Sequence, residues 1–154
     1  MRIAVGSDHH GVDTRSKLCA ILERLGHEVM EFGPDRESPD PVDYPDVASE
    51  VAGRLSRGEV DRGVLICGTG IGMSIAANKF AGVRAAPVFD EFSAELSRRH
   101  NDLNLLCLSG DNTSEELVDR LVEIWLDTPF EEGRHSRRVD KIKEIEQEFH
   151  GKNA

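Results

Sequence analysis

The sequence predicts an α/β fold: a three-layer αβα sandwich with a five-stranded, mainly parallel, Rossmann-like sheet and an added C-terminal helix. Short aliphatic runs alternate with amphipathic stretches along the 154 residues, which is typical of βαβ units with right-handed crossovers. Apolar residues make up 38% of the chain and aromatic residues only 5%, so we expect an aliphatic core. A chain of this length fits one domain, over 1–154.

Five segments have the pattern of buried strands, because each is short, aliphatic and bounded by turn residues. We expect the sheet order 2-1-3-4-5, which makes the first and third strands neighbours. The predicted strands are 2–6, Glu28–Phe32, 63–67, 83–88 and 103–109.

Amphipathic segments between the strands predict helices on both faces of the sheet. They are 12–25, 44–57, 71–80, 91–99 and 114–126, and the capping-box pattern "TSEE" opens the last of them. A further helix over 136–150 has an apolar stripe at helical spacing, made of Val139, Ile142, Ile145 and Phe149. The stripe can pack on its own domain or on a partner subunit, and we carry the partner subunit forward as the hypothesis.

Composition argues against several classes of function. Nineteen basic residues against 29 acidic ones give a net charge of −10, so nucleic acid is not an expected partner. The N-terminus enters a strand pattern directly and no apolar run reaches membrane length, which predicts a cytoplasmic protein with no membrane partner. Three cysteines, an odd number, favour reduced thiols. Cys19 and Cys107 lie in apolar patterns typical of buried hydrophobes.

Two loops with reactive side chains follow the first and third predicted strands. Asp8, His9 and His10 come after the first strand, and "CGTG", starting at Cys67, comes after the third. Ligands of open α/β sheets bind outside the carboxyl ends of the strands. We therefore expect the two loops to face each other across one crevice.

The stretch "ICGTGIGMSIAANK" does not fit the common phosphate and thiol motifs. A P-loop needs Gly-Lys-Ser/Thr, but Gly72 is followed by Met73. A dinucleotide fingerprint needs G-x-G-x-x-G after the first strand, whereas this is G-x-G-x-G after the third. A cysteine phosphatase loop needs an arginine where Met73 stands. What remains is a loop of closely spaced backbone N–H groups at a helix N-terminus, which suits an anion or a developing oxyanion.

Cys67 is placed where the same N–H groups favour a thiolate, which suits acyl transfer or proton abstraction next to a carbonyl. A nucleophilic cysteine would want a histidine base, and the sequence leaves open whether His9 or His10 has that geometry. The alternative is that the loop has only a structural role. In that case the glycines let the third helix pack tightly on the sheet, and Cys67 only fills space in the core.

Two polar clusters lie outside this crevice. His100 and Asn101 precede the fifth strand, at the amino edge of the sheet, so they either end a helix or serve a site on another subunit. Arg134, Arg137 and Arg138 cluster at the start of the C-terminal helix, as a solvated end or as an anion clamp. The histidines and acids show no recognised ligand spacing, so no metal site is predicted.

Taken together, these segments resemble one known family. "GSDHHG", "DYPD", "GVLICGTGIGMSIAANKFAGVRAA", "SRRHNDLN" and "EGRHSRRV" occur in the same order and at the same spacing as in ribose-5-phosphate isomerase B and the related galactose-6-phosphate and allose-6-phosphate isomerases. The resemblance runs from about Ile3 to Glu148, and the combination is far more specific than any single motif. It implies reversible aldose–ketose isomerisation of a sugar phosphate through a cis-enediolate, without metal or organic cofactor.

The resemblance also implies roles for individual residues. Cys67 resembles the base that moves a proton between C1 and C2, and Thr69 the residue that helps to shift the hydroxyl proton. Asp8 and His100 resemble the groups that open the sugar ring. The other matching positions are substrate-binding ones: the amides of Gly68, Gly70, Ile71 and Gly72 for the enediolate, Tyr44 and a partner subunit's Asn101 for the sugar, and His9, Arg134 and Arg138 for the phosphate.

One position departs from the family pattern. After the fifth strand, family members commonly have Gly-x-Arg, whose arginine helps to hold the phosphate, whereas Asp111 stands at that position here. A carboxylate repels a phosphate dianion, so the departure bears on which sugar phosphate is bound.

The main hypothesis is a homodimeric isomerase, or a dimer of dimers, that converts ribose 5-phosphate to ribulose 5-phosphate. One alternative is an isomerase of another tetrose or hexose phosphate, which Asp111 makes more credible. The other is a sugar-phosphate-binding domain without turnover, and the intact set of Cys67, Thr69 and His100 argues against it.

Overall fold

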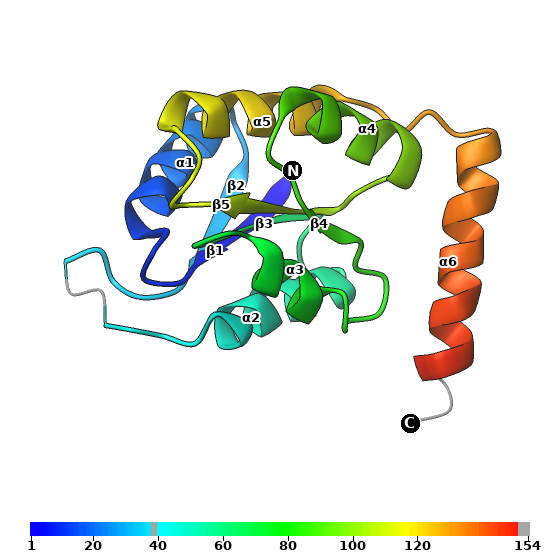
Figure 1. Cartoon of the computed structure of the whole chain (residues 1–154), viewed down its shortest axis with the longest axis horizontal. Coiled ribbons are helices and arrows are strands. Elements are labelled where there is room, and N and C mark those ends of the chain that lie inside the picture. Colours follow the sequence, from blue (N-terminus) through cyan, green and yellow to red (C-terminus); the bar gives the residue numbers. More distant parts are fainter. Residues whose placement is uncertain (38–39, 151–154) are drawn as a thin grey trace.

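The structure, a computed structural model, describes residues 1–37 and 40–150 and has the predicted alternation of strands and helices (Figure 1). Each predicted element is present with small shifts at its ends, and the C-terminal helix begins two residues before Ser136. The elements are β1 (Arg2–Ser7), α1 (Val12–Arg24), β2 (Glu28–Phe32), α2 (Tyr44–Ser56), β3 (Arg62–Cys67), α3 (Ile71–Ala77), β4 (Ala85–Pro87), α4 (Glu91–Asn101), β5 (Leu105–Ser109), α5 (Glu115–Asp127) and α6 (Arg134–His150).

The five strands form one parallel sheet in the order β2-β1-β3-β5-β4. The expected neighbours β1 and β3 do pair, but the predicted order 2-1-3-4-5 is wrong at its end, because β5 lies between β3 and β4. The burial of β4 and β5 explains why these two strands have swapped positions relative to the prediction. All five residues of β5 are buried, as a central parallel strand requires, whereas β4 has three half-buried residues. Pro87 in β4 cannot donate to a ladder and suits an edge strand.

Two hydrophobic cores, one on each face of the sheet, make the sandwich three layers thick (Figure 1). Helices α1, α4 and α5 cover one face, where Trp125 is fully buried and its indole N–H donates to the carbonyl of Leu103 at 3.0 Å. Helices α2 and α3 cover the other face, and Cys67 is part of that second core. The predicted αβα sandwich is confirmed.

Arg15 ties the connection after β2 to the carboxyl edge of the sheet. Its guanidinium is buried and donates to Ser7 Oγ at 3.0 Å, to the Phe32 carbonyl at 2.9 Å and to the Pro34 carbonyl at 2.6 Å. An ion pair to Glu31 at 2.7 Å completes its contacts. The proline-rich segment that follows is therefore held at its start, while Ser38 and Pro39 lie outside the described residues.

Helix α6 runs past the β4 edge of the sheet and away from the other helices (Figure 1). It is held at its start, where Val139 is buried, and again where the Glu146 carboxylate accepts from the N–H of Gly82 at 2.9 Å. Ile142 and Ile145 remain 46% and 59% exposed. No helix within residues 1–37 and 40–150 combines the length and the apolar character needed to cross a membrane.

Candidate active site

The carboxyl ends of β1 and β3 bring the two predicted loops together. Ser7 pairs with Ile66 in the ladder, and the N–H of Asp8 donates to the Ile66 carbonyl at 3.2 Å. Asp8 directly follows Ser7, and Cys67 directly follows Ile66. Each of the two is only 5% exposed. The same pair of strands thus brings a carboxylate and a thiol together at the carboxyl edge of the sheet.

The loop after β3 turns sharply around the sulfur of Cys67. Gly70 adopts a left-handed conformation with φ of 78°, and its N–H donates to Cys67 Sγ at 3.1 Å. The hydroxyl of Thr69, an exposed residue, accepts from the N–H of Ile71 at 3.3 Å, at the first turn of α3. The loop therefore presents a thiol, a hydroxyl and backbone amides within a few residues of one another.

The chain after β5 is fastened to this loop. The N–H of Gly110 donates to the Cys67 carbonyl at 2.7 Å, and Ser109 Oγ donates to the Gly68 carbonyl at 2.6 Å. The N–H of Asp111 donates to the same Gly68 carbonyl at 3.4 Å. These bonds fix the backbone of Asp111 beside the reactive loop.

Tyr44 and His9 both make contacts near the start of α2. A Cβ on Gly72 would lie 2.6 Å from Cζ of Tyr44, so the ring of Tyr44 rests directly on the Gly72 backbone, and a larger residue at position 72 would push the ring away. Nδ1 of His9 accepts from the N–H of Val42 at 3.4 Å, just before α2 begins at Tyr44. The entry to α2 thus places the ring of Tyr44 next to the loop and holds the imidazole of His9 at Val42.

The other predicted site residues lie at the opposite edge of the sheet. His100 and Asn101 end α4, just before the amino end of β5, and Arg134 begins α6. Since β3 and β5 run parallel, Cys67 lies at the carboxyl edge and His100 at the amino edge. One chain therefore gathers Asp8, His9, Tyr44 and the loop from Cys67 to Gly72 at one edge, and His100, Asn101, Arg134 and Arg138 at the other.

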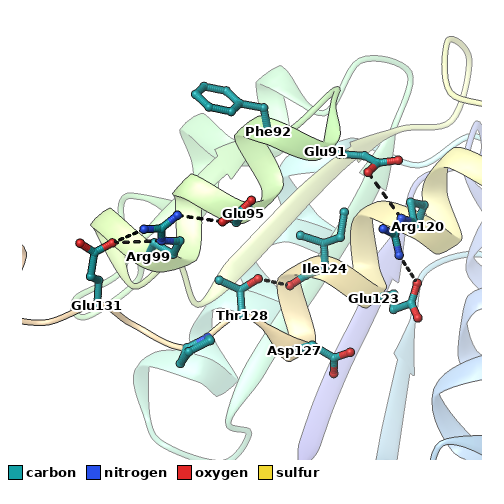
Figure 2. A pocket seen from close by; sticks show the side chains of 11 residues that line it. Glu91, Phe92, Glu95, Arg99, Arg120, Glu123, Ile124, Asp127, Thr128 and Glu131 are labelled. Carbon is teal, nitrogen blue, oxygen red and sulfur yellow. Dashed lines mark hydrogen bonds and ion pairs between the residues drawn. The ribbon is translucent and has the colours of Figure 1, made fainter.

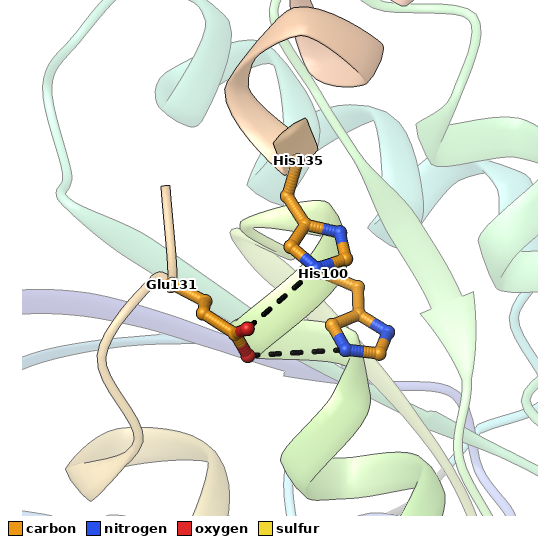
Figure 3. Close-up of side chains that lie close together, drawn as sticks. All are labelled: His100, Glu131 and His135. Atoms are coloured by element: carbon orange, nitrogen blue, oxygen red, sulfur yellow. Dashed lines mark ion pairs between the residues drawn. The ribbon is translucent and has the colours of Figure 1, made fainter. Parts of the chain in front are cut away.

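At the amino edge, His100 stacks on His135 with ring centroids 4.1 Å apart and ring planes 6° from parallel (Figure 3). The Glu131 carboxylate faces both rings, at 4.0 Å from His100 Nε2 and 3.9 Å from His135 Nε2. Burial lowers the pKa of His135, and the neighbouring His100 lowers it further. The stack therefore pairs a buried imidazole with the half-exposed ring of His100 and fixes the plane of that ring.

The ligand atoms of His100, Glu131 and His135 lie within 4.8 Å of one another, a spacing that could hold a metal ion, although the sequence predicted no metal site. Two arginines beside the cluster disfavour a cation there. Arg99 binds Glu131 at 2.9 Å and lowers the pKa of its carboxyl through their hydrogen bond. Arg134 Nε donates to His135 Nε2 at 3.4 Å. A divalent cation here would compete with Arg99 for the carboxylate and face Arg134 as well.

The model of the ribose/galactose isomerase family matches residues 3–142, a range that includes both edges of the sheet and all the predicted site residues. The chain belongs to the ribose/galactose isomerase family. It is a sugar phosphate isomerase of the aldose–ketose type, which confirms the enzyme class expected from the sequence.

Relatives in this family cover nearly the whole chain. Ribose-5-phosphate isomerase B of Escherichia coli (strain K12) is 47% identical over 146 residues, which are 95% of this chain and 97% of the relative. D-erythrulose-4-phosphate isomerase of Pectobacterium atrosepticum is 37% identical over 142 residues, 92% of this chain and 93% of the relative. The crystal structure of ribose-5-phosphate isomerase B from Mycoplasma genitalium with bound ribulose-5-phosphate has a TM-score of 0.91 and 39% identity, and covers 96% of this chain and 97% of that one.

The structure adds two residues to the amino-edge cluster that the sequence reasoning left without a role. His135 lies inside the quoted motif "EGRHSRRV", but its burial against His100 depends on how α6 leaves the domain. Glu131 lies in the connection before α6, where nothing in the local sequence distinguishes it from the other acids. The only available signal for His135 was its place beside Arg134.

A groove between α4 and α5 borders the amino-edge cluster, because Glu131 lines the groove and also belongs to that cluster (Figure 2). It has a volume of about 720 Å³, and ion pairs line it, among them Arg120 with Glu91 and Arg99 with Glu95. Phe92 lies at its rim and is 71% exposed. Because the groove contains no thiol and none of the predicted site residues, its size alone gives it no place in the chemistry.

Replacing Gly70 with Ala is expected to lower the free energy of unfolding by more than the ~1–2 kcal/mol that a left-handed residue with a side chain costs. The excess arises because the new Cβ would lie 3.2 Å from the backbone of Leu108. Gly58→Ala is the matched control, since Gly58 has φ of 73° and nothing within 4 Å of its Cβ position. Urea unfolding of both variants measures the difference, and equal losses would contradict the close approach at Gly70.

Proposed function

We propose that this isomerase converts ribose 5-phosphate to ribulose 5-phosphate, with Cys67 as the base. The observation that carries the proposal is the position of Cys67 Sγ, held by the N–H of Gly70 at the same edge of the sheet as Asp8, His9 and Tyr44. These are the residues at which the chain resembles ribose-5-phosphate isomerase B, and relatives with that name align over nearly its full length.

The proposed reaction starts from the closed sugar. Asp8 and His100 open the ring, because only the open-chain aldehyde makes the proton on C2 acidic. The thiolate of Cys67 then takes that proton, and the bonding electrons move toward the carbonyl to form a cis-enediolate. Thr69 helps to move the hydroxyl proton between O2 and O1, and the Cys67 thiol returns its proton to C1 to give the ketose.

Backbone amides stabilise the negative charge of the intermediate in this scheme. The amides of Gly68, Gly70, Ile71 and Gly72 are the proposed donors to the enediolate oxygen, which requires those of Gly70 and Ile71 to leave Cys67 Sγ and the Thr69 hydroxyl. Preorganised donors of this kind contribute most where charge appears in the transition state. Tyr44 would contact the sugar from its place on Gly72. His9 would contact the phosphate from the far side of the crevice.

A homodimer is part of the proposal, because His100, Asn101, Arg134 and Arg138 lie at the amino edge of their own chain. They can take part in the reaction only if the amino edge of one subunit meets the carboxyl edge of the other. Exposed Ile142 and Ile145 on α6 support a subunit contact on that side, since apolar side chains in a row favour burial. The proposal also keeps the cytoplasmic location predicted from the sequence.

A tetrose phosphate is the alternative substrate, and one observation favours it. A relative named D-erythrulose-4-phosphate isomerase is 37% identical to this chain. Family membership alone therefore does not decide the length of the sugar, which must come from the residues that line the crevice.

The proposal is tested by incubating the protein in deuterated water with a panel of tetrose, pentose and hexose phosphates and following deuterium at C2 by NMR. We expect exchange with ribose 5-phosphate and accumulation of ribulose 5-phosphate. Faster exchange with erythrose 4-phosphate would move the assignment to the tetrose. If no sugar phosphate exchanges deuterium, the proposed reaction is wrong. The remaining hypothesis is then a domain that binds a sugar phosphate without turnover.

A further inference from the structure

We infer that His135 is a positioning residue for this reaction: its buried imidazole stacks on the ring of His100 and holds that ring in one plane for opening the sugar. The inference rests on the proposed function and adds to it a residue for which that scheme has no role. His135 acts only through His100 and does not itself touch the sugar.

The two rings are held unequally, and this difference shows which ring positions the other. The side chain of His135 is 3% exposed, so the domain packs around it, whereas the side chain of His100 is 34% exposed. The ring centroids lie 4.1 Å apart and the ring planes are 6° from parallel (Figure 3). A histidine side chain otherwise turns readily about χ2, because this torsion has broad energy wells. Contact over one whole face removes that freedom from His100.

Glu131 ties the stack to the end of α4. Its backbone N–H donates to the Arg99 carbonyl at 3.0 Å, and its carboxylate pairs with the Arg99 guanidinium at 2.9 Å. The same carboxylate lies 4.0 Å from Nε2 of His100 and 3.9 Å from Nε2 of His135. Both imidazoles therefore turn the same nitrogen toward one negative charge, which sets the direction of each ring within its plane.

A turn with an unfavourable backbone conformation leads from Glu131 to His135. Glu132 and Gly133 have φ of 61° and 59°, in the left-handed region that a residue with a side chain enters at a steric cost. The N–H of His135 donates to the Glu132 carbonyl at 3.1 Å. Strain of this kind persists only where the surrounding structure determines it. The turn brings the start of α6 against the end of α4, and so His135 against His100.

His135 contributes a flat ring to this contact, and its charge is not needed. Burial lowers the pKa of His135 and the neighbouring His100 lowers it further, so the site disfavours a proton on this ring. Arg134 Nε donates to Nε2 of His135 at 3.4 Å, which is longer than most hydrogen bonds. A phenylalanine ring offers the same plane without the nitrogen. We therefore expect His135→Phe to keep the contact that His135→Ala removes.

Only one of the two sugars in the proposed reaction needs ring opening. Ribose 5-phosphate closes through its O4 hydroxyl, so opening breaks the C1–O4 bond, takes the proton from the O1 hydroxyl and gives a proton to O4. Ribulose 5-phosphate cannot close into a furanose, because its O5 carries the phosphoryl group. Exchange of its C1 proton through Cys67 needs no ring opening. A residue that acts through His100 should therefore matter for the aldose and not for the ketose.

The test measures by NMR the conversion of ribose 5-phosphate and, separately, deuterium exchange at C1 of ribulose 5-phosphate. We expect His135→Ala to lower kcat for ribose 5-phosphate by about tenfold to 10²-fold, since a small misplacement of a catalytic group can cost that much, and to leave C1 exchange unchanged. His135→Phe should keep both rates close to those of the wild type. His27→Ala is the matched control, because His27 directly precedes β2 at the same edge of the sheet, and it should change neither rate.

Two kinetic results would overturn the inference. The first is an equal loss in both assays for His135→Ala, because a merely structural role lowers the two rates together. The second is a His135→Phe variant that converts ribose 5-phosphate as slowly as His135→Ala, because the flat ring would then not be the feature that matters.

The NMR signals of the His100 ring protons separate this inference from the proposed function. A ring stacked face to face moves the signals of its neighbour upfield, and the variant His100→Asn identifies the signals of His100. We expect upfield signals in the wild type and in His135→Phe, and a downfield movement in His135→Ala. Signals that do not move in His135→Ala overturn the inference, whatever the activity of the wild type. If they move but the wild type turns over no sugar phosphate, the proposed function is wrong and the positioning of His100 by His135 is supported.

Discussion

Replacing Cys67 with Ser is expected to lower kcat for exchange at C2 by about 10²–10⁴-fold, the range that a positioned general base contributes. A serine hydroxyl does not ionise at neutral pH, so it cannot take the C2 proton. Binding should change little, because Cys67 is buried and a serine oxygen can still accept from the N–H of Gly70. The measurement is deuterium incorporation at C2 by NMR, together with calorimetric binding of the sugar phosphate.

Cys19→Ser is the matched control for this prediction. Burial raises the pKa of the Cys19 thiol to about 12, and the nearby Glu31 adds to the shift, so Cys19 stays protonated and cannot serve as a base near neutral pH. Its replacement should leave exchange unchanged. Burial likewise raises the pKa of Cys107, with a smaller contribution from Cys67. Full activity in Cys67→Ser would show that another group is the base.

Most of the fold could be predicted because alternating short aliphatic runs and amphipathic stretches leave few arrangements other than a parallel sheet with helices on both faces. The sheet order could not be taken from chain order. The run Leu105–Leu108 is apolar throughout and belongs in the sheet interior, whereas Pro87 marks β4 as an edge strand. Apolar character and the position of proline therefore indicate the place of a strand in the sheet better than its order along the chain does.

The candidate site was predictable where it depends on strand ends and unpredictable where it depends on contacts across space. Asp8 and Cys67 had to meet because parallel neighbours end at the same edge. The stack of His135 on His100, and the pairing of Asp111 with His10, join segments far apart in the chain. Periodicity and spacing carry no information on such contacts, and the roles assigned from the family resemblance remain predictions.

Mixing two inactive variants, Cys67→Ala and His100→Asn, is expected to restore activity. If a working site takes Cys67 from one subunit and His100 from its partner, a mixed dimer contains one site with both residues intact and one site that lacks both. Random pairing of equal amounts then gives about one quarter of the wild-type activity, since half of the dimers are mixed and each has one working site of two. The variants are unfolded together, refolded and assayed by C2 exchange.

The pair Cys67→Ala and Thr69→Ala is the control, because both residues belong to the same loop. A mixed dimer of these variants has a defect in each site, so refolding together should recover nothing beyond the residual activity of the separate variants. The contrast depends only on which edge of the sheet supplies each residue.

If Cys67→Ala and His100→Asn also fail to complement although mixed dimers are isolated through two different tags, His100 does not act across the subunit boundary. Ring opening would then have to rest on Asp8 and other groups of the carboxyl edge, where the structure places Asp8 within hydrogen-bonding distance of the backbone of His10.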